Sequence, residues 1–289
     1  MTPLKNIIRK NKFLDFLFIV LSSFFLLFSL LMLTLLILDL AVTGLPRISW
    51  AFLFSFPSRF ADKAGILSAW VGTTCVMGVT ALTAIPLGIA SGIYLEEYAQ
   101  KNWMMHLIEI NISNLASVPS IVFGLMALGI FVYTLGLGHS ILSAGLTLGL
   151  LILPIVICTT REAIRAVPGY IREASYAVGA TQWQTIRDHI LPYSTGGILT
   201  GIMIALCRAI GETAPLITIG ALTFIAFLPH SLLDPFTVMP IQMFNWTSRP
   251  QEAFHVNAAA TGIILLGMTL SMNAVAIYVR TSFRKKIQW

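Results

Sequence analysis

Two charged side chains lie inside an apolar stretch of the sequence, IALCRAIGETAPLITIG at residues 204–220. Arg208 and Glu212 are four residues apart, so a helix would place them on one face, where they can form an ion pair. If the stretch crosses a membrane, a lone arginine near its centre costs at least about 2.5 kcal/mol, so Arg208 requires a partner or water. Gly211 and Pro215 are poor helix formers, and Pro215 has no N–H to donate to the Gly211 carbonyl. The stretch therefore predicts a charge pair beside a break in a helix.

The charge pair has two interpretations. It is either an internal ion pair that only stabilises a helix bundle, or part of a transport pathway. Arginine before glutamate is the less favourable order within one helix, and broken helices near the midplane are where transporters bind substrates. The N–H groups that a break exposes suit an anion. In the pathway interpretation Arg208 contacts the anion transiently, Glu212 holds Arg208 when the path is empty, and Thr213 lies beside them.

The composition indicates a membrane protein. Hydrophobic residues make up 57% of the chain and charged residues 10%, whereas soluble domains carry about 25% charged residues. The formal net charge of +6 would suggest nucleic-acid binding in a soluble chain. Here the basic residues gather beside the apolar segments, as the positive-inside rule expects, so we expect no nucleic-acid partner.

Several apolar runs are long enough to cross a bilayer, which takes about 20 residues in a helix. The run at 110–160 suffices for two spans, with GLGHS at 136–140 as the turn between them. Counting about 1.5 Å per residue from Gly196 puts Arg208 roughly 18 Å into its span, close to the midplane. We expect an all-α protein with six transmembrane helices, at Phe16–Leu38, Ala64–Leu95, two within Ile110–Thr160, Gly196–Leu228 and Val256–Val279.

Three pairs of glycines stand four residues apart inside these spans. Small residues at this spacing let helix backbones approach closely in a membrane. They predict tight helix packing at Gly88/Gly92, Gly145/Gly149 and Gly197/Gly201.

The lysines and arginines predict the orientation, because cytoplasmic loops carry the excess of these residues. With the N-terminus inside, thirteen of them fall on the cytoplasmic side and four on the outer side, with Arg208 left in the membrane. Both termini are then cytoplasmic. The inside residues are Lys5, Arg9, Lys10, Lys12, Lys101, Arg161, Arg165, Arg172, Arg187, Arg280, Arg284, Lys285 and Lys286, and the outside residues are Arg47, Arg59, Lys63 and Arg249.

The cytoplasmic segment VPGYIREASYAVGATQWQTIRDHILP, residues 167–192, predicts two short helices joined by a tight turn. Gly179 stands where a left-handed helix cap belongs. Thr181 and Gln184 form the Thr-x-x-Gln pattern of a capping box for the second helix, which Pro192 is expected to close. An apolar stripe on that helix is expected from Trp183, Ile186 and Ile190.

Three functions remain open for this hairpin on physical grounds. A DNA-binding helix-turn-helix is disfavoured, because membrane helices tether both ends of the hairpin and keep it from a major groove. It is alternatively a plain interfacial hairpin, or a compact docking element for a cytoplasmic partner.

The hairpin resembles the EAA motif of type I ABC importer permeases, which runs Glu-Ala-Ala, three residues, Gly, nine residues, Ile, one residue, Leu-Pro. Two positions depart from the pattern, since Ser175 replaces the second alanine and His189 stands where isoleucine is usual. The resemblance implies that the loop docks in a groove of an ATPase subunit through Glu173, Ala174 and Gly179. The matching residues are Glu173, Ala174, Gly179, Leu191 and Pro192.

Similarity to the PstA family, the A-type permeases of phosphate-specific ABC importers, covers roughly residues 65–280. It implies a six-helix, MetI-like bundle, with a first helix and outside loop in 1–63, a permease domain in 64–289 and a coupling loop at 159–195. GETAPL in particular points to the A-type. The stretches that carry the similarity are YLEEYA (94–99), NISNLASVPSIVFGL (111–125), LPIVICTTREAIRAVP (153–168) and RAIGETAPL (208–216).

The sequence lacks the motifs of an ATPase or a hydrolase. It has no Gly-Lys dipeptide and so no Walker A loop, and neither HExxH nor GxSxG occurs. The three cysteines form no CxxC, and the five histidines are dispersed, so we expect no metal, no cofactor and no catalytic residue. Energy for uphill transport then comes from a separate ATPase or from an ion gradient.

The resemblance implies a permease subunit in the inner (plasma) membrane of a bacterium, crossing it several times among membrane lipid. Its expected partners are a homologous second permease, two copies of a cytoplasmic ATP-binding subunit, an extracytoplasmic phosphate-binding protein and inorganic phosphate. Two alternatives stay open. The cargo is another oxyanion such as sulfate or molybdate, or the chain is a proton-coupled secondary transporter with Glu212 as proton carrier.

Overall fold

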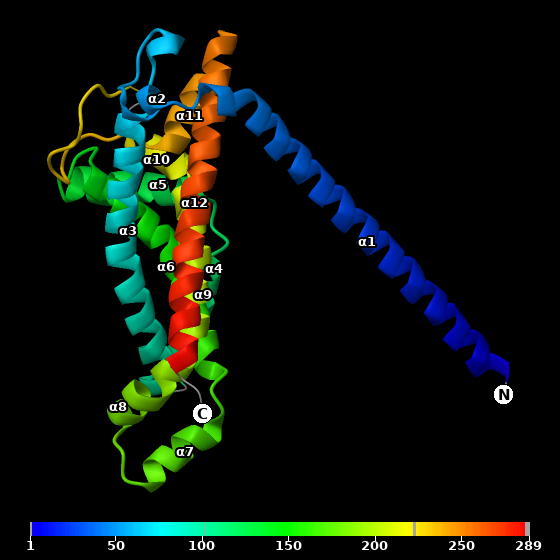
Figure 1. Ribbon diagram of the computed structural model, residues 1–289. Coiled ribbons are helices and arrows are strands. Elements are labelled where there is room, and N and C mark those ends of the chain that lie inside the picture. The colour runs from blue at the N-terminus through cyan, green and yellow to red at the C-terminus, as the bar shows by residue number, and fades with distance from the viewer. Residues whose placement is uncertain (1, 101, 222–223, 287–289) are drawn as a thin grey trace.

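The computed structural model describes residues 2–100, 102–221 and 224–286, and these residues form helices and loops without any strand (Figure 1). The all-α prediction is confirmed. The long helices are α1 (Thr2–Gly44), α3 (Leu67–Ile93), α6 (Ile141–Arg165), α9 (Leu191–Ile210) and α12 (Glu252–Lys286). The short ones are α2 (Trp50–Phe54), α4 (Trp103–Leu115), α5 (Ser120–Ala127), α7 (Gly169–Ala177), α8 (Gln182–Thr185), α10 (Ala214–Ile219) and α11 (Met239–Thr247). Tight 3-10 turns occupy Leu45–Arg47 and Ala61–Lys63, and wider π-helical turns occupy Tyr94–Tyr98, Leu128–Thr134 and Ile186–Ile190.

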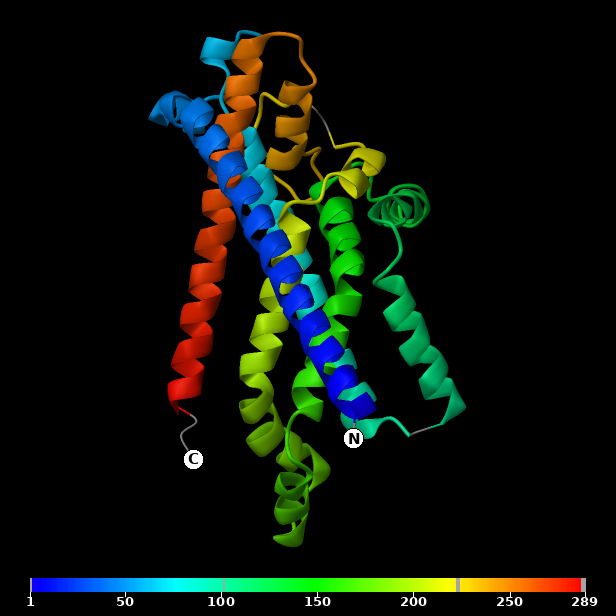
Figure 2. The same cartoon turned by 90° about the vertical axis from the view of Figure 1, so that its right-hand side faces the viewer.

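Helix α6 is central to the bundle. It packs along both α3 and α9, and α9 in turn packs against α12. These long helices share one general direction in both views, while α7 and α8 project beyond one end (Figures 1 and 2). Helices α2 and α11 lie at the opposite end (Figure 1).

The glycine pairs allow this close packing, as predicted. A Cβ added to any of these glycines would lie between 2.1 and 2.8 Å from a side chain of the facing helix, which is too close for a real contact. Bare backbone at these positions therefore sets the distances from α6 to α3 and α9. The facing pairs are Gly88 with Val156, Gly92 with Thr160, Gly145 with Val79, Gly149 with Thr83, Gly197 with Ala163 and Gly201 with Thr159.

The structure agrees with the prediction of six spans if the bent pair α4 and α5 is counted as one of them. Among the described residues, five helices are long and apolar enough to cross a membrane, and the pair α4 and α5 makes a sixth crossing if counted as one span. That pair is bent by 105°, so the third span is not the straight helix that was expected. Pro119 lies at the junction, has no N–H for the helix ladder, and disfavours helical backbone at the preceding Val118.

The predicted fifth span, Gly196–Leu228, is wrong at both ends. The helix continues without interruption from Gln182 to Ile210, and irregular backbone follows α10. Pro192 was expected to close the hairpin's second helix, yet it lies inside this longer helix. The π-helical turn just before it explains this, because the Leu191 N–H bonds to Ile186 five residues back and the ladder no longer needs a Pro192 donor. Residues 222–223 of the predicted span lie outside the described residues.

Both ends of the chain lie toward the same end of the molecule, as the predicted orientation requires. The N-terminal end of α1 and the C-terminal end of α12 both lie toward the end of the molecule that carries α7 and α8 (Figures 1 and 2). Arg47 lies at the other end, where it donates to the Asn257 side chain at 2.8 Å and to the Ala64 carbonyl at 3.0 Å. Lys101, one of the predicted inside residues, lies outside the described residues.

Substituting Gly201 with alanine is expected to destabilise the bundle, while Gly196→Ala, on the same helix, serves as the matched control. A Cβ at Gly201 would lie 2.1 Å from the Thr159 hydroxyl, whereas nothing lies within 4 Å of one at Gly196. Overpacking of this kind typically costs about 1–3 kcal/mol. Thermal unfolding of the purified protein in detergent should show a lower melting temperature for Gly201→Ala alone. Equal melting temperatures would contradict the close α6–α9 contact.

Candidate functional site

The predicted break carries the predicted charge pair. Helix α9 ends at Ile210 and α10 begins at Ala214, with Gly211 capping the end of α9. The Arg208 Nε lies 3.4 Å from the Glu212 Oε1, so the two side chains form an ion pair across the end of the helix. Thr213 precedes α10, and its carbonyl accepts from the N–H groups of Leu216 and Ile217.

Arg208 is incompletely satisfied by this pair. Its side chain is 41% exposed, against 17% for Glu212, and the described residues offer its guanidinium no hydrogen-bond acceptor other than the glutamate. The remaining donors are thus available to water, a partner chain or an anion. The depth of about 18 Å for Arg208 assumed that its helix begins at Gly196. Since the helix begins earlier in the chain, that depth does not follow from the structure. The position near the midplane stays a prediction.

Helix α3 flanks the break from the bundle side. Val76 packs in a buried cluster with Leu216 of α10, and Met77 packs in another with Ala209 and Ile210 of α9. The two halves of the broken helix therefore share one neighbour, and a displacement of α3 here would act on both.

The hairpin at residues 167–192 has the predicted glycine turn and the predicted capping box. Gly179 has φ of +85°, the left-handed conformation that glycine adopts most readily. Thr181 and Gln184 form the capping box, with hydrogen bonds in both directions between side chain and backbone. The predicted apolar stripe is only partly right, because Ile186 and Ile190 are fully buried while Trp183 is 54% exposed. The π-helical turn that starts at Ile186 changes the helical register between them.

The outer face of α7 presents the residues of the EAA resemblance. Glu173 and Ala174 are exposed, and Glu173 makes no ion pair or hydrogen bond with any described residue. Ser175, which departs from the pattern, is buried and bonds to the Thr185 hydroxyl at 2.8 Å. This bond links α7 to α8, so the departure strengthens the hairpin rather than weakening it.

His189, the second departure, lines an apolar groove of about 480 Å³ between α7 and the start of α9. Ile190 beside it points inward and packs with Ile164, Val167 and Ile186. The isoleucine thus supplies a contact to the bundle, while the histidine faces the groove. The groove is lined by Tyr170, Ile171, Ala174, Ser175, Val178, His189 and Tyr193.

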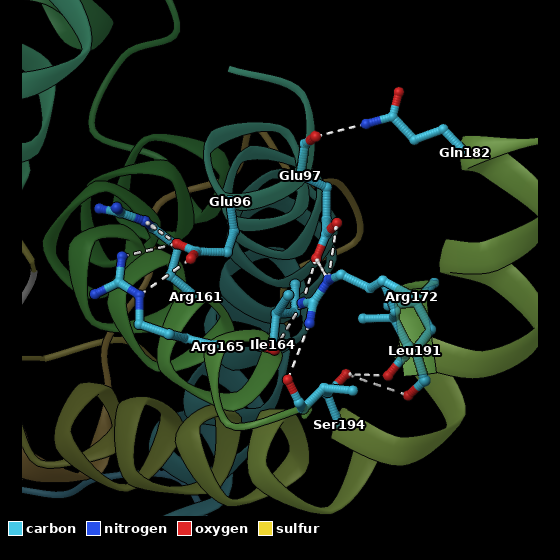
Figure 3. A network of polar contacts seen from close by, with 11 residues as sticks. Glu96, Glu97, Arg161, Ile164, Arg165, Arg172, Gln182, Leu191 and Ser194 are labelled. Carbon is cyan, nitrogen blue, oxygen red and sulfur yellow. Dashed lines mark hydrogen bonds and ion pairs between the residues drawn. The ribbon is translucent and has the colours of Figure 1, made fainter. Parts of the chain in front are cut away.

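A cluster of charges joins the hairpin to the helix ends (Figure 3). Arg161, whose side chain is only 7% exposed, pairs with Glu96 at 3.4 Å and with Glu109 at 2.8 Å. Arg165, one turn on, forms two bonds of 3.0 and 2.9 Å with the same Glu96 carboxylate. Arg172 of α7 pairs with the neighbouring Glu97 at 2.6 Å.

In the sequence these arginines served only to predict the orientation, and no role was predicted for the two glutamates. A signal was present, because two adjacent acids end an apolar run at 94–98 and two arginines stand four residues apart at 161 and 165. Four-residue spacing puts both arginines on one face of α6, where a common carboxylate can bind them. The pairing across more than 50 residues required the fold.

The structure keeps the two groups of predicted residues apart. Arg208, Glu212 and Thr213 lie at one end of α9, and the hairpin with Glu173, Ala174 and Gly179 precedes its other end. From Leu191 to Arg208 the helix rises about 26 Å. Within the described residues no group of histidine, cysteine and acidic side chains could hold a metal ion.

Comparisons with known proteins show which family the chain belongs to. The family model described as "Binding-protein-dependent transport system inner membrane component" matches residues 84–288. The phosphate transport system permease protein PstA of Yersinia pestis is 34% identical, covering 93% of this chain and 89% of that protein. PstA 1 of Mycobacterium tuberculosis is 33% identical, with 80% and 74% covered. The probable ABC transporter permease protein YqgI of Bacillus subtilis is 30% identical, with 85% and 88% covered.

Solved structures agree on the fold. A structure titled "Inward facing conformations of the MetNI methionine ABC transporter" matches 73% of this chain and 94% of its own, with a TM-score of 0.60 and 16% identity. This likeness supports the expected MetI-like helical bundle. With a family model over most of its length and relatives above 30% identity, the chain belongs to the binding-protein-dependent transport system inner membrane components and, within them, to the PstA permeases.

Proposed function

We propose that this chain is the membrane-spanning permease subunit of an ATP-driven phosphate importer and forms half of its translocation pathway. The phosphate cargo follows from the PstA relatives, which are named as phosphate transport permeases. The energy source follows from the family, whose members act in binding-protein-dependent transport systems. The chain is a transport component and not an enzyme.

The hairpin is the observation that best supports a separate ATPase as the energy source. It is compact, capped, held by the Ser175–Thr185 bond, and projects beyond the helices (Figure 1). A proton-coupled secondary transporter has no use for such an element. Docking uses the exposed Glu173, which can pair with a basic residue of the ATPase, together with Ala174 and the turn at Gly179.

At the other end of α9, Arg208 offers phosphate a transient contact. Its 41% exposure and the donors that no described residue accepts support this role, since a guanidinium with free donors can bind an oxyanion. Glu212 holds the guanidinium while the path is empty, and Thr213 lines the turn beside them. A tight permanent site is not needed, because the cargo must leave.

The complete importer contains a homologous second permease, two ATP-binding subunits and an extracytoplasmic phosphate-binding protein. One chain of this size encloses little room for a hydrated anion, which supports a second permease half. Both termini and the hairpin face the cytoplasm, as the charge distribution favours. Co-purification of the complex followed by a phosphate-stimulated ATPase assay tests this composition. Stimulation by sulfate or molybdate instead would indicate a different anion as cargo, carried by the same kind of ATP-driven importer.

Replacing Arg208 with glutamine is expected to abolish phosphate uptake in vesicles while the complex still assembles, because the anion loses its cationic contact. The double variant Arg208→Gln with Glu212→Gln decides between the two interpretations, since it removes the pair without leaving a lone charge. Normal phosphate transport by the double variant would show that the pair is structural. Arg59→Gln, which removes an exposed arginine outside both the hairpin and the break, is the control and should transport normally.

Replacing Gly179 with valine is expected to uncouple ATP hydrolysis from transport. A side chain at a left-handed position costs about 1–2 kcal/mol, so the turn between α7 and α8 rearranges. Gly169→Val is the matched control, because a Cβ has open space at both positions and only Gly179 has a positive φ. Transport per ATP should fall in the first variant alone. Coupled transport by Gly179→Val would indicate a plain interfacial hairpin.

Cysteine labelling tests the orientation in a background that lacks the three native cysteines. Val178 on the hairpin is 84% exposed and Trp50 at the opposite end is 77% exposed. A membrane-impermeant maleimide should label Val178→Cys only from the cytoplasmic side and Trp50→Cys only from the outside. The reverse pattern would overturn the assignment of both termini to the cytoplasm.

A further inference from the structure

Two adjacent glutamates at the end of α3 point to different partners. Helix α3 passes at its end into the π-helical turn Tyr94–Tyr98, which carries both of them. Glu96 faces Arg161 and Arg165 on α6, while Glu97 faces Arg172 on the hairpin helix α7 (Figure 3). One turn of α3 is thereby fixed on one side to the bundle and on the other to the hairpin.

The contact between Glu97 and Arg172 is buried and specific. The Glu97 side chain is 6% exposed, and its Oε1 accepts from the Arg172 Nη2 at 2.6 Å and from Nε at 3.1 Å. The other donors of Arg172 go to the carbonyls of Val167 at 2.9 Å and Ile164 at 3.2 Å. Glu97 is the one carboxylate that these bonds bring to Arg172, and its removal would leave the arginine charge without a counterion in a largely enclosed site.

The second hairpin helix reaches the same residue. The Gln182 Nε2, at the start of α8, donates to the backbone carbonyl of Glu97 at 2.5 Å (Figure 3). Both helices of the hairpin therefore make a polar contact with Glu97. Helix α7 contacts its side chain, and α8 contacts its backbone carbonyl. If the hairpin moved as a unit, both of its helices would displace this one residue.

Helix α3 extends from Glu97 to the break beside the charge pair. Val76 and Met77, which contact both halves of the broken helix, lie about 30 Å from Glu97 along α3. The glycine contacts with α6 keep the helix close to the bundle along this length. Helix α3 contains Pro86 within this length, and its close packing against α6 holds it as one contiguous element from the hairpin to the break, through which two sites can be coupled.

We propose that Glu97 is the positioning residue that passes movement of the hairpin to α3, and through α3 to the break at Arg208 and Glu212. This inference rests on the proposed function of the hairpin as the ATPase docking element. Glu97 does not touch the cargo. It determines whether a movement imposed by the ATPase reaches the helices that line the path.

The test compares Glu97→Gln with Glu96→Gln in the complete importer, reconstituted with its partner subunits and binding protein. Both changes neutralise a carboxylate on the same turn and break an ion pair, but only Glu97 contacts the hairpin. Glu97→Gln should lower phosphate transport per ATP by about tenfold at unchanged KM for phosphate-loaded binding protein. Glu96→Gln should lower the melting temperature of the complex and leave transport per ATP unchanged.

Three outcomes would overturn the proposal. These are normal coupling in Glu97→Gln, an equal loss of coupling in both variants, or a loss of transport that only follows the amount of assembled complex. Gln182→Ala provides a second, milder variant in case Glu97→Gln assembles poorly, and it should lower transport per ATP without destabilising the bundle. If the wild-type complex shows no phosphate-stimulated ATPase activity, the proposed function fails instead.

Discussion

The close approach of α3 and α6 is the contact on which the rest of the structure depends. Glycines on both helices meet side chains of the other, so neither helix can move sideways without a clash or a void. Helix α6 also carries the arginines that bind Glu96, and α3 carries the residues that contact both halves of the broken helix. The hairpin, the charge cluster and the break are therefore all attached to the same pair of closely packed helices.

Arg161 and Arg208 differ in how fully their charges are satisfied within the described residues, and they suit different roles. Arg161 is 7% exposed and bound by two carboxylates, as expected for a charge that the fold must neutralise. Arg208 is 41% exposed and has one contact of 3.4 Å. A charge that must meet a passing anion has to remain partly unsatisfied, because full satisfaction would remove its affinity for the cargo.

Local chemistry explains which features could be predicted from the sequence. Gly179, the capping box and the break after Ile210 follow from backbone preferences of a few adjacent residues, and the structure shows all of them. The continuation of the helix through Pro192 depends on a π-helical turn that no simple periodicity reveals. The spans themselves follow from apolar length, and the bend between α4 and α5 follows from Pro119, whose effect a count of apolar residues does not include.

The charge cluster illustrates the limit of sequence reasoning for the site. Glu97 and Arg172 are 75 residues apart, and only the packing of α3 against α6 brings the hairpin within reach of the end of α3. The positions and charges of both residues were visible in the sequence, but their pairing was not. The predicted pathway and docking residues lie in local motifs, which is why they could be named before the fold was known.

The first helix has a consequence of a different kind. Helix α1 leans away from the bundle (Figure 1), and its apolar side chains are exposed along its length, while its C-terminal end is held where Gly44 meets the backbone of Ala259 and Ala260. Its apolar run of 23 residues, Phe16–Leu38, is about 35 Å long against a hydrocarbon thickness of about 30 Å, so it fits with a tilt of about 30°. A difference in bilayer thickness is therefore expected to change the tilt of this helix relative to the bundle. A thinner membrane increases the tilt and swings the N-terminal end outward about its anchored end, and a thicker one brings it upright.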